Sequence, residues 1–325
     1  MIAELLTFEQ IGPLEELLLR MGNGMFPGEG VESLDPETTV SRILRRLSDI
    51  TTNGGTTKVY TVRGRASGMI VVGQDEWAFR ELGRPGYRIE CLVALGRLEE
   101  QLFVKTLLVH DVLKTLPRGN PLVARVPHTD VTGINVLGRH GFVATQTALM
   151  LAAEIGDTDA TETPVDSYYG VVPAEPEDID RLDDGILRIP DGVFGWDAYL
   201  PCGVRSKVHR DWLQSYTRHH GLLLAFHHDR LVGLLAEHFS DEQCPTNGNQ
   251  VAHIDLITAA AEYRNNGVTG TLMNHAFRQF RTRGIRRVEL TIHFADAPTV
   301  NQLEKGGFTA LGSSLVMTNW RGMEY

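Results

Sequence analysis

The sequence predicts an α/β (α+β) protein with two similar halves, each a mixed, mostly antiparallel sheet flanked by helices. The chain has 325 residues, which is long for one hydrophobic core and favours two domains. Its 42% hydrophobic and 22% charged residues are typical of a globular protein. Apolar segments with strand-like and helix-like spacing follow one another twice along the chain, in the same order.

The second half repeats the first at a nearly constant distance. Gly68 in RASGMIVV corresponds to Gly233 in RLVGLLAE, 165 positions later. Further on, residues 130–149 match residues 296–315 at a shift of 166. A shift that stays almost constant over so long a stretch indicates duplication. The acidic, threonine-rich stretch 154–166 is the predicted linker, so we expect domains at residues 1–155 and 166–325.

Each half has the same predicted order of elements. A strand opens it, at residues 3–8 or 168–172. Two helical stretches follow, which the second half places near residues 177–187 and 207–219. Next come a hairpin, a strand, a helix, a strand, a short helix and a closing strand. The segments that fix this order are the hairpins 58–72 and 222–237, the strands 87–94 and 251–259, and the alternating strand 288–293.

The stretch EYRNNGVTGTLM, from Glu262 to Met273, joins a predicted strand to a predicted helix. Free N–H groups and the helix dipole make such a helix start an anion site, and glycines let a phosphate approach the backbone. The stretch has neither the GK[ST] of a Walker A loop nor a spaced glycine triplet. A tight turn without a ligand is the structural alternative.

These residues resemble the GNAT acyltransferase superfamily, whose coenzyme A pyrophosphate loop reads [QR]-x-x-G-x-[GA]. Arg264 to Thr269 fits this pattern except at its last place, where threonine stands and Gly270 follows. The family's downstream N-x-x-A…Y-x-x-x-GF pattern resembles Asp296 to Phe308, with Leu303 in place of the tyrosine. The resemblance implies acyl-CoA as cosubstrate. It implies that the cofactor is bound by Leu256, Ile257, Thr258, Arg264, Asn265, Asn266, Gly267, Val268, Thr269, Gly270, Asp296 and Asn301.

The first half provides an internal control for this loop. It has Glu99, Glu100 and Gln101 at the corresponding helix start, and carboxylates there would repel a pyrophosphate. They would instead suit the first turn of the helix itself. We therefore expect only the second half to bind coenzyme A, as in tandem members of the family such as mycothiol synthase.

The predicted strand before the loop reads VAHIDLITAA and places His253 and Asp255 on one face. The arylalkylamine acetyltransferases have two histidines at these places, which implies that His253 is the general base and that Asp255 is its partner or a second base. The structural alternative is a pair that only stabilises the strand. Leu303 leaves the usual general acid unassigned, and His293 on the neighbouring strand is a candidate for it.

Acceptor binding is expected between the halves, by analogy with tandem members of the family. Arg88 and Glu90 occupy the places of the catalytic pair in the first half. The aromatic stretch 193–203 supplies Trp196 and Tyr199, which either stack on a substrate or simply pack. The implied activity is transfer of an acyl group to a small-molecule amine, such as an amino sugar of a glycopeptide antibiotic. A mycothiol-synthase-like acetyltransferase and an inactive coenzyme-A-binding protein are the alternatives.

Composition argues against several other classes of protein. The net charge of −10 disfavours nucleic acid and anionic membranes as partners. Cys91, Cys202 and Cys244 are far apart without a CxxC pair, which predicts no disulfide framework and no metal site. The start MIAELLTFEQ is not typical of a signal peptide, and no apolar run is long enough to span a membrane, so we expect a cytoplasmic protein.

Overall fold

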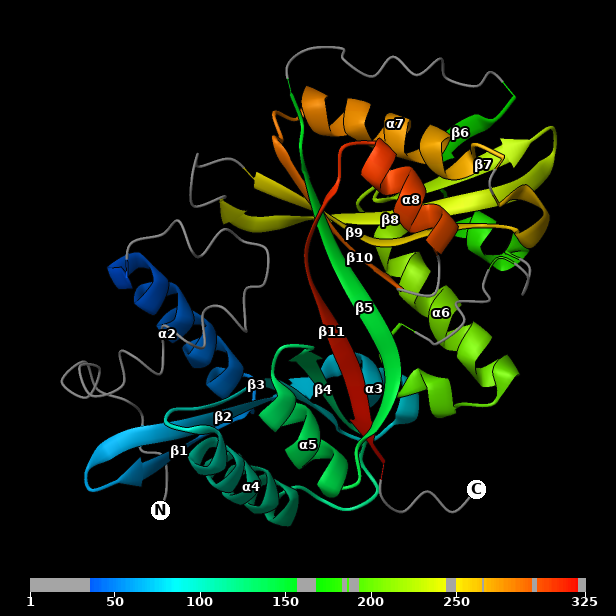
Figure 1. The fold of residues 1–325 in the computed structure, drawn as a ribbon. Coiled ribbons are helices and arrows are strands. Elements are labelled where there is room, and N and C mark those ends of the chain that lie inside the picture. Colours follow the sequence, from blue (N-terminus) through cyan, green and yellow to red (C-terminus); the bar gives the residue numbers. More distant parts are fainter. Residues whose placement is uncertain are drawn as a thin grey trace. The chain divides into compact units, whose positions relative to one another are not determined.

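The computed structural model describes residues 36–156, 168–182, 186, 193–243, 250–264, 266–293 and 297–320. The predicted opening strand at 3–8 and most of the predicted linker lie outside this range. The chain forms two compact units (Figure 1). Unit 1 comprises residues 1–146 and 313–325, and unit 2 comprises residues 147–312.

Unit 1 is a sheet with helices on both faces. Its strand order is β1-β2-β3-β4-β11, in which β3 and β4 are parallel and the other pairs are antiparallel. The elements are α2 (Pro36–Thr52), β1 (Thr56–Val62), β2 (Arg65–Asp75), α3 (Glu76–Leu82), β3 (Gly86–Ala94), α4 (Leu98–Thr115), β4 (Leu122–Pro127), α5 (Val131–Arg139) and the end of β11 (Thr309–Asn319).

Unit 2 has the same plan with one more described strand. Its order is β5-β10-β9-β8-β7-β6, in which only β9 and β10 are parallel among the described pairs. The elements are β5 (Val143–Glu154), β6 (Gly170–Pro173), the 3-10 helix η4 (Pro176–Arg181), η5 (Asp197–Tyr199), α6 (Cys202–Thr217), β7 (Leu222–His227), β8 (Arg230–Gln243), β9 (Gln250–Ala259), η6 (Ala261–Tyr263), α7 (Val268–Thr282), β10 (Arg287–His293) and α8 (Ala297–Lys305). The fold class expected from the sequence, a mixed and mostly antiparallel sheet flanked by helices, is confirmed.

The last strand of each half is not confined to that half's unit. Residues 148–154 of β5 pair with β10 in unit 2, and residues 314–319 of β11 pair with β4 in unit 1. Leu149, Leu151 and Ala153 of β5 accordingly belong to the core of unit 2. The compact units therefore differ from the two halves of the sequence repeat.

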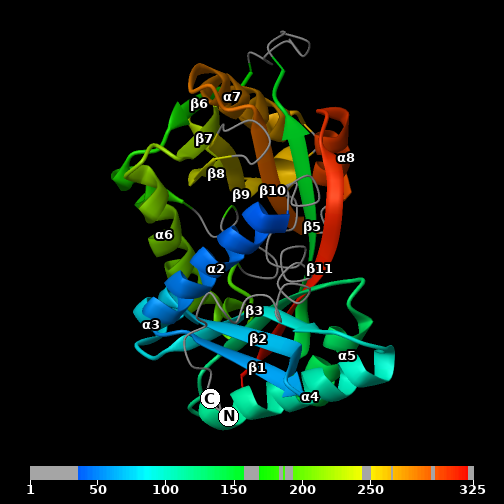
Figure 2. The same ribbon diagram turned by 90° about the vertical axis from the view of Figure 1, so that its left-hand side faces the viewer.

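Both units pack helices on each face of the sheet. In unit 2, α7 covers one face and α6 lies against β7 and β8 on the other (Figure 1). In unit 1, α4 and α2 take these two positions (Figure 2). A glycine allows the first helix of each pair to approach closely. Gly68 lies under Val104 and Leu108 of α4, and Gly233 lies under Val268 and Leu272 of α7.

The strand that follows the hairpin in each unit, β3 in unit 1 and β9 in unit 2, has a β-bulge at the same place. In β9, Leu256 pairs with Ala236 and Ile254 with Glu237, so Asp255 is the extra residue. The core positions accordingly change from Ala252 and Ile254 to Ile257 and Ala259 across it. In β3, Cys91 pairs with Val71 and Ile89 with Val72, so Glu90 is the extra residue.

Among the described helices, none combines the length and the apolar character that a membrane span requires.

Candidate active site

The centre of the candidate site is the point where β9 separates from β10. Their parallel pairing runs from Arg287 opposite Val251 to Leu290 opposite Ile254 and then stops. Strand β9 continues to Ala259, and its other edge stays paired with β8 as far as that residue. One edge of β9 beyond Ile254 therefore has no strand partner within the described part of the chain. Its backbone, which includes the predicted Leu256, Ile257 and Thr258, can bond a ligand that runs along the strand.

The helix that follows β9 presents an anion site at its start. Gly267 precedes α7 with φ 88, a left-handed conformation that favours glycine. The first backbone bond of the helix runs from the Thr271 N–H to the Gly267 carbonyl, at 2.9 Å. The N–H groups of residues 268–270 thus have no acceptor within the helix, and they point with the helix dipole toward one place. This geometry is suited to a phosphate.

The remaining loop residues hold this turn in place. The Arg264 Nε donates to the Ala259 carbonyl at 3.5 Å, and the Tyr169 hydroxyl donates to the Asn266 carbonyl at 2.9 Å. Thr269, which departs from the family pattern, is buried. Gly270 has room beside it, because an added Cβ would have its nearest neighbour, Gln302 Nε2, at 3.6 Å. Asn301 is exposed on α8, whereas Asn265 and Asp296 lie outside the described residues.

Asp255 joins side chains from three elements at the separation point. The Tyr216 hydroxyl of α6 donates to Asp255 Oδ2 at 2.9 Å. The imidazole Nδ1 of His238, from β8, hydrogen bonds to the same oxygen. The ring of His238 stacks on that of His253, with centroids 5.0 Å apart and an interplanar angle of 17°. Tyr216, His238, His253 and Asp255 form what we call the histidine cluster.

A second carboxylate lies beside His253. Its Nδ1 is 3.9 Å from Glu289 Oε2 on β10. The other oxygen of Glu289 accepts a bond of 2.8 Å from the Arg287 guanidinium, which also lies 3.2 Å from Glu154. Glu289 is thus held by an arginine and faces the histidine, whereas Val288, Leu290 and Ile292 point into the core as the alternation predicted.

The charge on Asp255 shapes the protonation of its partners. The hydrogen bond from His238 to Asp255 raises the pKa of that imidazole, and burial opposes this only partly. Burial, followed by the charge of Asp255, raises the pKa of Tyr216 far above its usual range. The phenol therefore stays protonated and acts only as a donor. His238 has the stronger basicity that a proton acceptor needs.

The structure gives Asp255 two partners that the sequence did not indicate. His253 and Asp255 do share a face, but the described hydrogen bonds of Asp255 go to His238 and Tyr216 and not to His253. His238 and Tyr216 were missed because they come from β8 and α6, far from the motif. The position of His238 opposite His253 on paired strands follows from the bulge register, which no residue pattern signals.

The other predicted site residues fall in different places. Trp196 is 0% exposed and stacks on Phe194 with centroids 5.1 Å apart, so its ring has no face for a substrate, and packing is its role. Tyr199 is half-buried in η5. Leu303 belongs to the core of unit 2. His293 ends β10, and its side chain lies outside the described part. Arg88 and Glu90 both line a cavity within unit 1.

The corresponding helix of unit 1 offers no comparable anion site. Val104 of α4 packs over Gly68 as Val268 of α7 packs over Gly233, so these two positions are equivalent. Helix α7 begins at this position, whereas α4 begins six residues before it, at Leu98. The backbone at Val104 is therefore inside the helix, where its N–H groups are bonded. At the helix start, the Glu100 carboxylate accepts the Arg97 N–H at 2.8 Å. A carboxylate thus occupies the mouth of α4.

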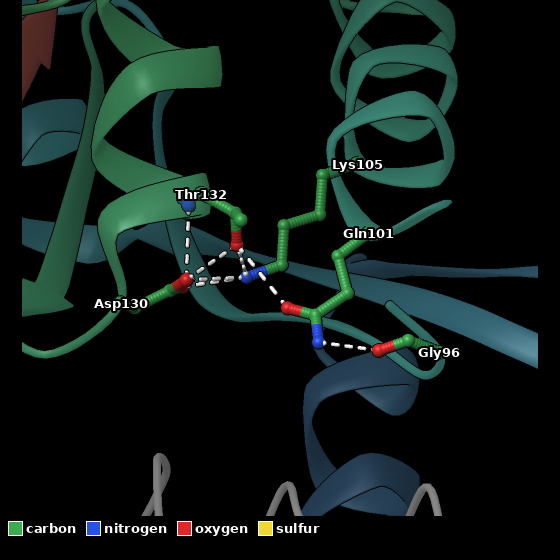
Figure 3. A network of polar contacts seen from close by, with 6 residues as sticks. Gly96, Gln101, Lys105, Asp130 and Thr132 are labelled. Carbon is green, nitrogen blue, oxygen red and sulfur yellow. Dashed lines mark hydrogen bonds and ion pairs between the residues drawn. The ribbon is translucent and has the colours of Figure 1, made fainter. Parts of the chain in front are cut away.

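A buried ion pair locks this helix to α5 (Figure 3). The Lys105 ammonium lies 2.6 Å and 2.7 Å from the two oxygens of Asp130 and 2.9 Å from the Thr132 hydroxyl. Gln101 joins the network and donates to the Gly96 carbonyl at 2.8 Å. By the packing equivalence, Lys105 takes the place of Thr269 in the loop of unit 2.

In unit 2, the strand that leaves its neighbour therefore ends beside a helix start with free N–H groups. Residues 193–308 match the model of the acetyltransferase (GNAT) family. The matched part of the chain contains the Arg264–Gly270 loop and all four residues of the histidine cluster.

Solved structures extend the likeness of fold to nearly the whole chain. A GCN5-related N-acetyltransferase from Sphaerobacter thermophilus is 13% identical with a TM-score of 0.59, and the match covers 95% of this chain and 94% of that one. A GCN5-related glucosamine N-acetyltransferase region of a fungal multi-domain GH3 β-N-acetylglucosaminidase is 12% identical with a TM-score of 0.53, covering 94% of this chain and 37% of that one. Comparison with curated proteins gives no match.

Proposed function

We propose that this protein is an acyl-CoA-dependent N-acyltransferase in which unit 2 binds the acyl-CoA and carries out the transfer to the amine of a small molecule. The single observation that supports this most is the adjacency of two features on β9. The free edge of β9 begins at Asp255, the residue after Ile254. The histidine cluster is built around that same residue. A thioester lying along the free edge would have proton acceptors next to its carbonyl carbon.

In the proposed reaction, the amine nitrogen attacks the thioester carbonyl, an N–C bond forms, and the C–S bond then breaks. The nitrogen loses a proton to the imidazoles of His238 and His253, directly or through water. Asp255 holds His238 and stabilises its protonated form. Coenzyme A leaves as the thiolate or thiol, and backbone N–H groups of the free edge would bond the developing oxyanion.

The pyrophosphate of acyl-CoA is proposed to bind the N–H groups of residues 268–270. The conformation of Gly267 allows close approach, and Arg264 and Asn266 shape the turn around it. Unit 1 is proposed not to bind acyl-CoA, because Glu100 occupies the mouth of α4. The sequence-based boundaries of 1–155 for a degenerate half and 166–325 for a catalytic half stay a proposal about function.

For the acceptor, we propose a primary amine on a polar small molecule, with an amino sugar of a natural product as the leading class. The fungal region with the same fold is described as a glucosamine N-acetyltransferase, which supports this choice by fold only. The open side of the histidine cluster is consistent with a polar acceptor, because half of the His238 side chain is exposed.

The direct test is to incubate the protein with acyl-CoAs of several chain lengths and a panel of amines, and to measure the free thiol that forms. We expect amine-dependent thiol release, and a His253→Ala variant with turnover lowered by about 10²–10⁴ and acyl-CoA binding retained. Exposed His219, which lies past the end of α6, offers a matched His→Ala control with unchanged turnover. An unimpaired His253→Ala variant would reject its role.

A further inference from the structure

Unit 1 contains a cavity of about 510 Å³ whose lining residues are mostly of polar or charged types. One face of α2, the end of β2, the start of α3 and the bulged strand β3 form its walls. Its lining includes the charged side chains of Arg46, Asp49, Asp75, Glu76, Arg88 and Glu90. A cavity of this volume is within the range of small-molecule sites.

The cavity occupies the place in unit 1 that the histidine cluster occupies in unit 2. Glu90 is the bulge residue of β3 as Asp255 is the bulge residue of β9. One step along the paired strands, Gly73 lies opposite Arg88, where unit 2 has His238 opposite His253. Unit 1 therefore keeps a carboxylate at the bulge. It has glycine, with no side chain, where unit 2 has the imidazole that hydrogen bonds to this carboxylate.

Beside the Glu90 carboxylate there is space for a ligand, at the position where the His238 side chain lies beside Asp255 in unit 2. A Cβ built on Gly73 would be 3.2 Å from Glu90 Oε1, so the position of the missing side chain lies directly against this carboxylate. The only ion pair of Glu90 with a described residue is a long one, 3.8 Å from the Arg46 guanidinium. The Glu90 side chain is 19% exposed, which is enough contact with the cavity to bind a ligand and enough burial to strengthen the interaction.

The charge around the cavity favours a cation. Arg88 is occupied by Asp75, at 3.5 Å, and Asp75 also caps α3 through the Ala78 N–H. Neither Asp49 nor Glu76 has an ion-pair partner among the described residues. Four carboxylates thus face two guanidiniums. The amides of Asn53 and Gln74 and the ring of Trp77 complete a lining suited to a polar ligand.

We propose that this cavity binds a small polar primary amine, whose ammonium group pairs with Glu90 in the place that His238 takes beside Asp255. The amide side chains of the lining would bond hydroxyl groups of the same ligand. The site lies within unit 1, and its occupation requires no acyl transfer. The amine that binds it can also serve as an acceptor in the proposed reaction, or it can act only as an effector.

Binding can be measured on the full chain without acyl-CoA. We would titrate D-glucosamine and ethanolamine as amines, and N-acetyl-D-glucosamine as a neutral match of the first, and follow heat and tryptophan fluorescence. We expect saturable binding of at least one amine, little binding of the neutral sugar, and a fluorescence change that disappears in Trp77→Phe. Glu90→Gln keeps the shape of the side chain, and we expect it to weaken binding by at least about tenfold.

Two further variants locate the site. Gly73→His restores the imidazole found in unit 2 and should abolish binding, whereas Glu99→Gln, an exposed carboxylate of α4, should not change it. Asp255→Asn should also leave it unchanged. The proposal is overturned if neither amine binds, if the neutral sugar binds equally well, if Glu90→Gln binds as the wild type does, or if Asp255→Asn alone abolishes binding. Loss of acyl transfer in unit 2 would not affect any of these results.

One more experiment decides whether the bound amine is an acceptor or an effector. An acceptor is consumed when acyl-CoA is added, and its product appears by mass spectrometry, whereas an effector changes thiol release from another amine and is recovered intact. Either result supports the site. An amine that binds at Glu90 and is recovered intact, with no effect on thiol release, overturns its connection to the reaction.

Discussion

Asp255 is the residue through which three elements of unit 2 meet. It accepts hydrogen bonds from Tyr216 of α6 and from His238 of β8, and it is itself the bulge of β9. The bulge lies between the core residues Ile254 and Ile257, and the carboxylate of Asp255 bonds the α6 side chain of Tyr216. The raised pKa of His238 is a direct result of this contact.

Replacing Asp255 with asparagine should move the pH dependence of the reaction. A base works in its neutral form, so the rate falls as pH drops below the pKa of His238, which Asp255 raises. Asparagine removes the charge, the pKa of His238 returns toward its ordinary value, and the acidic limb of kcat/KM should shift to lower pH. The plateau rate should also fall, since the base is weaker. The pH profile of thiol release measures both.

A matched variant tests whether this shift comes from the carboxylate. Tyr216→Phe removes the other hydrogen bond to Asp255 and keeps its charge. It should therefore leave the acidic limb at the same pH or move it slightly upward. An unchanged limb in Asp255→Asn would mean that His238 is not the group that titrates.

Glu237 is a carboxyl group that the reaction does not use. It is 1% exposed, it lies under α7, and neither of its oxygens has a described hydrogen-bond partner. Burial raises its pKa from 4.5 to about 8, and the charge of Arg283 opposes this only partly. The group is therefore protonated in the folded protein at neutral pH.

Glu237→Gln should stabilise the protein at pH 8 and have little effect near pH 4.5. Between these values the unfolded chain loses the proton and the folded chain keeps it, so the free energy of unfolding of the wild type falls as pH rises. The glutamine has no proton to lose. The variant should gain at most about 4 kcal/mol at pH 8, at about 1.4 kcal/mol for each pH unit. Urea unfolding at the two pH values measures it, and an equal gain at both would contradict the assignment.

At the scale of single elements, the first turns of α7 and α4 explain how the two units differ. Helix α7 begins at Val268, directly over Gly233, and leaves free N–H groups there. Helix α4 begins earlier, at Leu98, in a first turn where Glu100 accepts the Arg97 N–H, and it then runs through the equivalent position. A longer helix with an acidic first turn removes an anion site without changing the sheet below it.

Gly267→Ala should raise the KM for acyl-CoA. The residue has φ 88, where alanine is strained by about 1 kcal/mol, and relief of that strain would move the N–H groups of the helix start. A helix terminus contributes ~0.3–2 kcal/mol to anion binding, so KM should rise roughly 2- to 30-fold. Gly284→Ala is the control. Gly284 has φ 74 just after the same helix, and its replacement should cost similar stability with no change in KM.

The sequence predicted the strand, loop and helix around Arg264–Gly270, because glycines and local spacing determine a turn of this kind. It also predicted the alternation of β10. It could not predict the bulge at Asp255, since a bulge depends on pairing with another strand. His238 was missed for that reason, and Tyr216 because α6 reaches the site through tertiary packing. The burial of Trp196 likewise depends on tertiary packing, since its ring stacks on Phe194, which in turn contacts Trp212 of α6.

At the scale of the whole molecule, the exchange of final strands limits where the chain can be divided. Residues 148–154 of β5 pair with β10 and fill the core of unit 2. A fragment of residues 166–325 lacks them and exposes the edge of β10, which favours aggregation. We expect it to be poorly soluble and to melt without cooperativity, whereas residues 147–325 should fold cooperatively. Equal melting of the two fragments would contradict the importance of this strand.

The two units share a fold but differ in their functional side chains. Both keep the bulge carboxylate, as Glu90 and Asp255, and both keep the glycine under the helix, as Gly68 and Gly233. Only unit 2 combines that carboxylate with imidazoles and with a helix start suited to a pyrophosphate. The proposal of a single acyl-CoA site in each chain rests on this difference.

Calorimetric titration of the full chain with acetyl-CoA tests that central claim most directly. We predict one site per chain, with binding lost in Gly267→Glu, which places a carboxylate at the mouth of α7 as Glu100 is placed at the mouth of α4. Gly284→Glu, with the same change after the helix, should bind as the wild type does. Two equivalent sites per chain, or an unchanged affinity in Gly267→Glu, would contradict the claim that unit 2 alone holds the acyl-CoA.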